Sequence, residues 1–176
     1  KIALEMALSR IKQLSAHEIG HTLGFSHNFL GSSNNNSSVM DYPHPIIELS
    51  NNKIDIGKAY SKGIGEWDKV SVAYSYSEFD ESEDEKLELE KILENSFKNN
   101  LRFISDSDSR PIGSSHPISH LWDNGTDAII ELKKITQIRD LALQNISLDH
   151  LKKGEPYSNL QDIIVPIYLL HRYQSE

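Results

Sequence analysis

One run of eleven residues near the start of the chain constrains it more than any other feature. The run is His17-Glu18-Ile19-Gly20-His21-Thr22-Leu23-Gly24-Phe25-Ser26-His27, with the spacing H-E-x-x-H-x-x-G-x-x-H. Three histidines, one glutamate and one glycine at these offsets should arise by chance on the order of once in ten thousand chains of this composition. The spacing therefore indicates a site that holds a metal ion.

The offsets match the periodicity of an α-helix. His17 and His21 are four residues apart, which places their side chains on one helix face about 5–6 Å apart, close enough to share an ion. His27 cannot reach that ion from a straight helix, so Gly24, a residue type that tolerates positive φ, is expected to turn the chain. Three imidazoles leave a fourth coordination position open, as catalytic zinc requires. We therefore expect one zinc ion per chain.

Glu18 has a different role in the same helix turn. It lies about 100° round the helix from His17 and therefore points beside the metal instead of at it. A carboxylate there can hold a water molecule and accept its proton, which makes Glu18 the predicted general base. Zinc lowers the pKa of a bound water to about 7 and polarises a carbonyl group, so the site predicts hydrolysis by an activated water.

A second motif, Ser38-Val39-Met40-Asp41-Tyr42-Pro43, follows the histidine run. Together the two motifs resemble the metzincin clan, whose hallmark is a tight turn that carries a methionine beneath the zinc ligands. The full string S-V-M-D-Y-P resembles a family of large, exported, mostly bacterial zinc-dependent metalloproteases. Further segments share this resemblance: Gln13-Leu14-Ser15-Ala16, His27-Asn28-Phe29, Gly63 to Lys69 and Leu121 to Gly125.

The resemblance implies that the protein hydrolyses peptide bonds in polypeptide substrates. It makes His17, His21 and His27 the zinc ligands, Glu18 the general base and Met40 the methionine of the turn. It also implies an α+β zincin-like (metzincin) catalytic domain. This chain would hold the mostly α part of that domain, with the active-site helix, the methionine turn and C-terminal helices, and without the upstream sheet.

The resemblance also predicts how the chain is divided. Apolar residues from Ile2 to Ile19 roughly keep helical spacing into the zinc motif, so the sequence is expected to open at or inside the active-site helix. Metzincins place a twisted sheet before that helix, and its edge strand binds substrate. The upstream half of the same full-length protein is therefore an expected partner. We expect residues 1–79 to form the C-terminal half of the catalytic domain and residues 80–176 a family-specific helical extension that packs on it.

Tyr42 follows the methionine by two positions. A tyrosine at this place in astacin-like and serralysin-like metzincins can approach zinc as a fifth ligand and swing to support the oxyanion, and the resemblance extends that role to Tyr42. A hydroxyl placed where negative charge develops can raise a rate roughly a hundredfold or more. The alternative is a turn tyrosine that packs its ring and bonds backbone with its hydroxyl.

Three other segments carry weaker signals. Residues 43–47 follow the methionine turn, where the resemblance places the pocket for the side chain after the scissile bond, so His44 is either a substrate contact or an ordinary loop histidine. Asp106 and Asp108 could bind a cation, although a turn rich in Asp and Ser needs none. The Ser/Asn loop at residues 31–38 is interpreted as a flexible spacer. Periodicity predicts further helices at residues 65–76, 80–97, 126–151 and 158–173.

Composition excludes several classes of function. The net charge is −8, but residues 78–94 hold nine acidic residues and two lysines, so the rest of the chain is near neutral. No cluster of basic residues indicates a nucleic-acid-binding surface. No segment has the length and apolar character of a membrane span. The chain has no cysteine, which excludes disulfides and thiol catalysis. The family resemblance implies a secreted, periplasmic or cell-surface location.

Two classes of function remain. The first is a zinc metalloendopeptidase that works by water attack without a covalent intermediate. The alternative is a non-catalytic zinc- or peptide-binding module of metzincin fold, which would have no need of Glu18, so the intact base favours the enzyme. Zinc-dependent hydrolysis of a non-peptide amide would use the same residues and differ only in the pocket.

Overall fold

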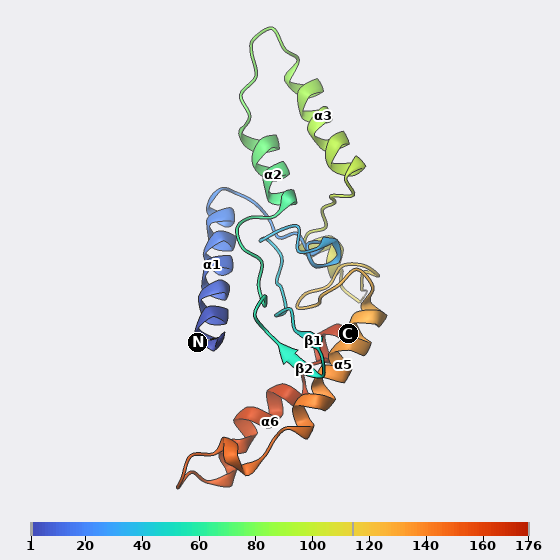
Figure 1. The fold of residues 1–176 in the computed structure, drawn as a ribbon. Helices are drawn as coiled ribbons and strands as arrows, with labels where there is room; N and C mark the ends of the chain where they lie inside the picture. The colour runs from blue at the N-terminus through green and yellow to red at the C-terminus, as the bar shows by residue number, and fades with distance from the viewer. Residues whose placement is uncertain (1, 114, 176) are drawn as a thin grey trace.

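The computed structural model describes residues 2–113 and 115–175. Most of them are helical, as the sequence predicted, and the described part contains one antiparallel sheet of two short strands. The molecule is elongated, with α1 along one side, α2 and α3 at one end and α5 and α6 at the other (Figure 1). The elements are α1 (Ile2–Thr22), η1 (Ser32–Asn34), β1 (Glu48–Ser50), β2 (Lys53–Asp55), α2 (Glu66–Tyr76), α3 (Glu85–Lys98), α4 (Asp106–Ser109), α5 (Ala128–Gln144), η2 (Leu148–His150), η3 (Tyr157–Leu160), α6 (Gln161–Tyr168) and α7 (Arg172–Ser175).

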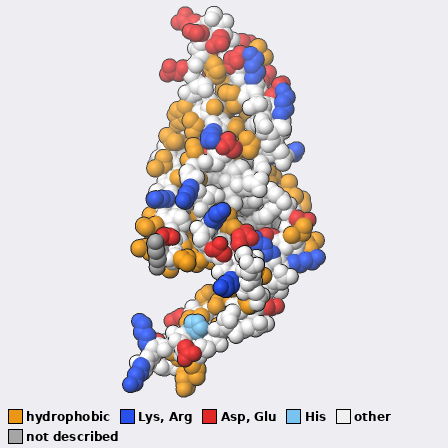
Figure 2. Space-filling view, in the orientation of Figure 1, with side chains coloured by type: hydrophobic (Ala, Val, Ile, Leu, Met, Phe, Trp, Pro, Cys, Tyr) orange, Lys and Arg blue, Asp and Glu red, His pale blue; other side chains and the backbone are white. Residues whose placement is uncertain are grey.

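Helix α1 turns its polar side toward the body of the protein. Its buried residues are Gln13, His17 and Gly20. A surface helix that packs on its own core normally buries its apolar side. Here apolar side chains line the outer edge of α1, which Figure 2 shows as an orange margin. The exposed ones are Ile2, Leu4, Leu8, Ile11, Leu14 and Ile19. Among the described residues, no helix is both long and apolar enough to cross a membrane.

Gly24 ends the histidine-bearing helix in the way that the sequence predicted. Its φ is +86°, in the left-handed region that favours glycine. The amide of Gly24 donates to the carbonyl of His21 over 3.0 Å, and the amide of Phe25 donates to the carbonyl of Gly20 over 3.0 Å. This pair of bonds is a Schellman motif, which closes the helix and redirects the chain. The redirected segment carries His27 back toward α1.

The loop at residues 31–38 is packed, and the interpretation as a flexible spacer is therefore wrong. Ser32, Ser37 and Ser38 are buried. The amide of Ser37 donates to the carbonyl of Gly31 over 3.0 Å, and the amide of Ser32 donates to the carboxylate of Asp41 over 2.7 Å. The polar composition of the loop supplies buried hydrogen bonds, because buried backbone groups need partners.

Residues downstream of position 80 contact the loop after the third histidine. The amide of Phe29 donates to the carbonyl of Ile104 over 2.9 Å, and Ser119 Oγ donates to the carbonyl of Phe29 over 3.3 Å. Phe29 is fully buried. The other buried apolar side chains among the described residues are Leu30, Val39, Met40 and Ala59, and Ile135 and Ile138 of α5. The predicted division of the chain at residue 79 stays a prediction.

Helices α2 and α3 pack against each other, and a short acidic connection joins them. The Asp84 side chain caps α3 by accepting from the amides of Lys86 and Leu87. Acidic side chains gather at this tip of the molecule (Figure 2). The acidic run is thus an exposed connection and helix face, as expected of solvated charge.

The C-terminal helices are shorter than their periodicity predicted. Helix α5 ends at Gln144, because Asn145 caps it and Ser147 begins a separate 3-10 turn with its own side-chain cap. The predicted helix at residues 158–173 is divided into η3, α6 and α7. Pro166 lies inside α6, which ends two residues later at Tyr168.

Candidate metal centre

Three histidines converge at the C-terminal end of α1. The nitrogens that His17, His21 and His27 could offer to a metal lie within 4.8 Å of one another. Nε2 of His17 is 3.1 Å from Nε2 of His21. In the described ranges this is the one group of three or more His, Cys, Asp or Glu side chains close enough to hold an ion. The sequence motif thus becomes a compact set of ligands with room for one metal.

Each histidine of α1 presents Nε2 to the cluster because its other nitrogen is already bonded. Nδ1 of His17 lies 2.8 Å from the carbonyl oxygen of Val39, and Nδ1 of His21 lies 2.9 Å from that of Phe25. A carbonyl oxygen only accepts, so each Nδ1 carries the proton and each Nε2 keeps its lone pair. Such outer hydrogen bonds orient the imidazoles of metal sites.

His27 has the same arrangement with a charged partner. Its Nδ1 lies 2.9 Å from Oδ2 of Asp106 and 3.2 Å from Oδ1. Its Nε2 is buried and has no hydrogen-bond partner among the described residues. A buried imidazole nitrogen without a partner costs free energy, and a metal ion in the cluster would satisfy it. The donor set therefore fits a zinc ion, which prefers neutral imidazole nitrogens.

The surroundings of His17 favour its neutral form. Burial is the main reason that the pKa of His17 lies below its ordinary value, and the neighbouring His21 and His27 lower it further. The Val39 carbonyl and the Glu18 carboxylate act in the opposite direction. A lowered pKa favours the neutral ring, the form that binds metals.

Met40 lies directly behind the histidine helix and is 3% exposed. A Cβ added at Gly20 would overlap the Met40 sulfur, so a larger residue there would force the buried Met40 side chain to move. This contact explains a glycine in the middle of a helix, where it costs about 1 kcal/mol relative to alanine. Met40 thus forms a packed floor under the helix turn that carries His17 and His21.

Asp68 holds the methionine turn in place, and the sequence reasoning did not single it out. Its carboxylate accepts from Ser38 Oγ over 2.6 Å, from the Val39 amide over 2.8 Å and from the Gly65 amide over 2.6 Å. Asp68 is the third residue of α2, a position from which an acid often caps its own helix start. The capping position of Asp68 in the G-E-W-D segment was the sequence signal from which its structural role could have been predicted.

Tyr42 lies beside the imidazoles with its ring held on both sides. Its ring centre is 4.6 Å from that of His27 and 5.5 Å from that of His17. The Trp122 indole stacks on it at 5.0 Å, with an angle of 15° between the planes, and the Trp122 amide donates to the Tyr42 carbonyl over 2.9 Å. Trp122 has φ +63°, an uncommon value for a bulky residue. A ring in this position is compatible with both roles considered for Tyr42, the oxyanion donor and the packing residue of the turn.

Glu18 and Asp106 lie at the edges of the cluster. Glu18 is exposed on α1, next to His17 in sequence. Partial burial would raise the pKa of Asp106, but the interactions with His27, together with hydrogen bonds from the backbone and from Ser105, hold that pKa below its ordinary value. Asp108 does not join a metal-binding group in the part of the chain that the structure describes. The suggested Asp106–Asp108 cation site therefore has no support here.

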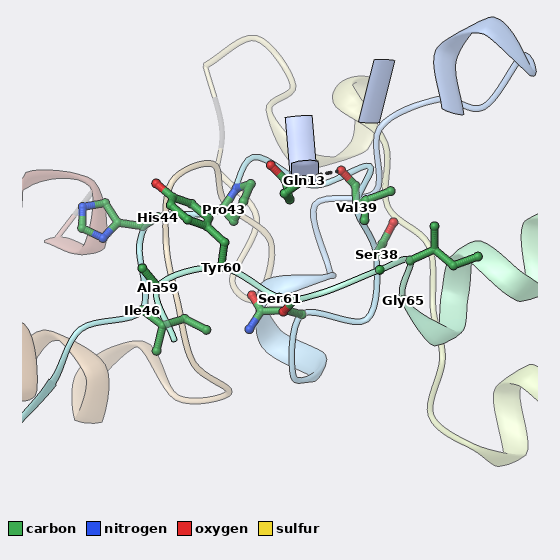
Figure 3. Close-up of a pocket in the computed structure, with 13 residues that line it drawn as sticks. Gln13, Ser38, Val39, Pro43, His44, Ile46, Ala59, Tyr60, Ser61 and Gly65 are labelled. Atoms are coloured by element: carbon green, nitrogen blue, oxygen red, sulfur yellow. Dashed lines mark hydrogen bonds between the residues drawn. The ribbon is translucent and has the colours of Figure 1, made fainter. Parts of the chain in front are cut away.

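A cavity lies next to the methionine turn and is shown in Figure 3. Its walls include Gln13, Val39, Pro43 and Tyr60. Gln13 Nε2 donates to the Val39 carbonyl over 3.2 Å across its roof. The His44 ring points away from the other labelled side chains in this view, and burial lowers its pKa. The cavity holds about 30 Å³, room for about one water molecule.

Asp41 is a buried carboxyl group one residue after the methionine. It accepts from the amides of Ser32 and Tyr42, each over 2.7 Å. Burial raises the pKa of Asp41 to about 7, and the nearby Asp123 carboxylate contributes to the rise. Burial likewise raises the pKa of Asp123. The two carboxyls share Ser32, because Ser32 Oγ donates to Asp123 over 2.9 Å.

This pKa makes stability depend on pH. The folded state holds the Asp41 proton more tightly than the unfolded chain, so the stabilisation is complete below about pH 4 and is lost as pH rises to about 7. We expect Asp41 to lower the unfolding free energy of metal-free protein by at most about 1.4 kcal/mol per pH unit in that window. Urea denaturation from pH 4 to 8 would measure the unfolding free energy as a function of pH. In Asp41→Asn the part of the pH dependence that is due to Asp41 should be absent. Parallel curves for the two proteins would contradict the prediction.

Comparison with known proteins agrees with this geometry. The sequence matches the model of a family described as Met-zincin over residues 1–176. Neither the curated proteins nor the solved structures contain a match. The family match confirms the resemblance to the metzincin clan and the predicted fold class, a mostly helical part of a zincin-like domain. Since the match spans the full sequence, the protein belongs to the Met-zincin family, which has a zinc-metallopeptidase-like fold.

Proposed function

We propose that the protein is a zinc-dependent metallopeptidase that hydrolyses peptide bonds in polypeptide substrates. One observation carries the proposal: the three histidines present free Nε2 atoms to one point while each Nδ1 has an acceptor. Such a fixed and convergent donor set is what a catalytic zinc ion requires. We propose one zinc ion per chain, held by His17, His21 and His27.

The residues around the cluster have distinct parts in the proposed reaction. Zinc, when bound, supplies a Lewis acid that activates water and polarises the scissile carbonyl. Glu18 accepts the proton of the attacking water and can return it to the leaving amine, as a general base and then acid does. The Tyr42 hydroxyl donates a hydrogen bond to the oxyanion as negative charge develops. Met40 and Asp68 act indirectly by fixing the floor and the turn.

The exposed apolar side of α1 supports a further part of the proposal. We propose that an upstream sheet of the same full-length protein covers this face and aligns substrate beside the metal. Residues such as Leu4, Leu8 and Ile11 offer it an apolar surface, since they are 64%, 47% and 58% exposed. A secreted, periplasmic or cell-surface location is proposed on the resemblance of the motifs alone.

Metal analysis and peptide digestion test the function together. We expect the purified full-length protein to contain one zinc per chain and to cleave members of a peptide library. A chelator should stop cleavage and added zinc should restore it. The His17, His21 and His27 triple alanine variant should lose the metal, while His150→Ala, outside the cluster, should keep it. Zinc retained by the triple variant, or cleavage that is indifferent to chelation, would refute the proposal.

A further inference from the structure

The third histidine of the cluster is paired with a carboxylate from a distant part of the chain. Asp106 lies 79 residues after His27 and begins the short helix α4. Both of its oxygens lie within 3.2 Å of Nδ1 of His27. The Asp106 side chain is 65% exposed and the His27 side chain 17% exposed, so the contact lies at the rim of the cluster.

A buried asparagine fixes the register of this contact. Asn28 is 1% exposed and directly follows His27. Its Oδ1 accepts from the Ile104 amide over 3.1 Å, and its Nδ2 donates to the Arg102 carbonyl over 2.9 Å. Together with the bond from the Phe29 amide to the Ile104 carbonyl, these bonds clamp residues 102–104 beside the third ligand. Asp106 therefore reaches His27 from a backbone that is anchored two residues away.

The Nδ1 atom of His27 has a different kind of hydrogen-bond partner from the Nδ1 atoms of His17 and His21. His17 and His21 bond neutral backbone carbonyls, whereas His27 bonds a carboxylate. Hydrogen bonds to ionised acceptors are roughly twice as strong as neutral ones. His27 is also the ligand that lies outside the helix, so neighbouring turns do not fix its ring. The strongest of the three Nδ1 hydrogen bonds is thus made by His27, the histidine whose ring the local backbone orients least.

We propose that Asp106 is a positioning residue of the metal centre. It holds the His27 ring by Nδ1, so that Nε2 faces the two histidines of α1. The inference rests on the proposed zinc site and adds to it that residues 102–106 are part of the centre. Carboxylates in this outer position make the imidazole a better donor, and their loss typically weakens metal affinity tenfold to a hundredfold.

Zinc affinity measured by competition with a chromophoric chelator tests this role. We expect Asp106→Ala to weaken zinc binding about tenfold to a hundredfold. Asp106→Asn keeps an acceptor oxygen and should recover part of that loss. Asp108→Asn removes an exposed acid from the same turn and should bind zinc like the unaltered protein. The visible spectrum of the cobalt-substituted protein should change in Asp106→Ala, because the third ligand is less well fixed.

Thermal unfolding of the metal-free variants separates positioning from a structural role. We expect metal-free Asp106→Ala and metal-free unaltered protein to unfold at similar midpoint temperatures. The two midpoints should differ only when zinc is added. A lower metal-free midpoint with unchanged zinc affinity would overturn the inference, as would equal zinc affinity in every variant. If the unaltered protein itself fails to bind zinc, the proposed function fails, and that result is distinct from a failure of the Asp106 assignment.

Discussion

Glu18→Gln should keep its zinc and lose most of its turnover, by about a hundredfold to ten-thousandfold. This is the usual range for a positioned general base, because the amide cannot accept a proton from the attacking water. Glu18 is exposed on α1 and its side chain fills no core, so the change should leave the fold intact. Steady-state hydrolysis of a cleaved library peptide, with zinc content measured on the same sample, provides the test.

The same helix offers a matched control for the base. Glu5 is exposed, acidic and remote from the cluster, so Glu5→Gln should retain the activity of the unaltered protein. Activity lost equally in both variants would point to a general effect of charge. Near-normal turnover by zinc-loaded Glu18→Gln would assign the base to another residue.

Tyr42→Phe should reduce kcat by about tenfold to a thousandfold, with little change in KM or zinc affinity. The hydroxyl would then be acting mainly in the transition state, where a hydrogen bond to the oxyanion matters most. Phenylalanine keeps the ring, so the stack on Trp122 and the contact with His27 are preserved. Kinetics at saturating and limiting peptide, together with a zinc titration, separate these quantities.

A packing tyrosine gives a different result in the same experiment. Loss of one hydroxyl would then cost at most about 1 kcal/mol of stability and leave kcat nearly unchanged. Tyr60→Phe is the matched control, because Tyr60 is a partly buried tyrosine on the wall of the neighbouring cavity. An unchanged kcat in Tyr42→Phe would exclude the catalytic role.

The parts of the site that were predictable depend on local rules. Helix periodicity placed His17 and His21 together, and the need for positive φ placed the turn at Gly24. These relations are set within a few residues of sequence or by the spacing of one motif. They need no knowledge of the tertiary fold.

The features of the site and fold that could not be predicted from the sequence depend on tertiary contacts or on turn conformation. The sequence offers only a polar turn or a cation site with Asp108 as interpretations of Asp106, because nothing in it links this residue to a histidine 79 residues earlier. The β1–β2 hairpin was also missed. Its turn residues Asn51 and Asn52 have φ of 50° and 59°, which asparagine tolerates better than most residues. Three-residue strands give too short an alternation to be recognised by period.

The clamp between residues 28–29 and residues 102–104 bears on how the protein is made. A ribosome completes both motifs when it has added Pro43, yet the partners of His27 and Tyr42 are still to come. At about 5–20 residues per second, Asp106 and Trp122 follow several seconds later. Contacts so distant in sequence also form slowly during folding, because a long loop must close first. A nascent chain therefore carries all three histidines before it has made Asp106, the partner of the His27 ring, so the proposed metal centre is completed only after synthesis has moved well beyond the motif.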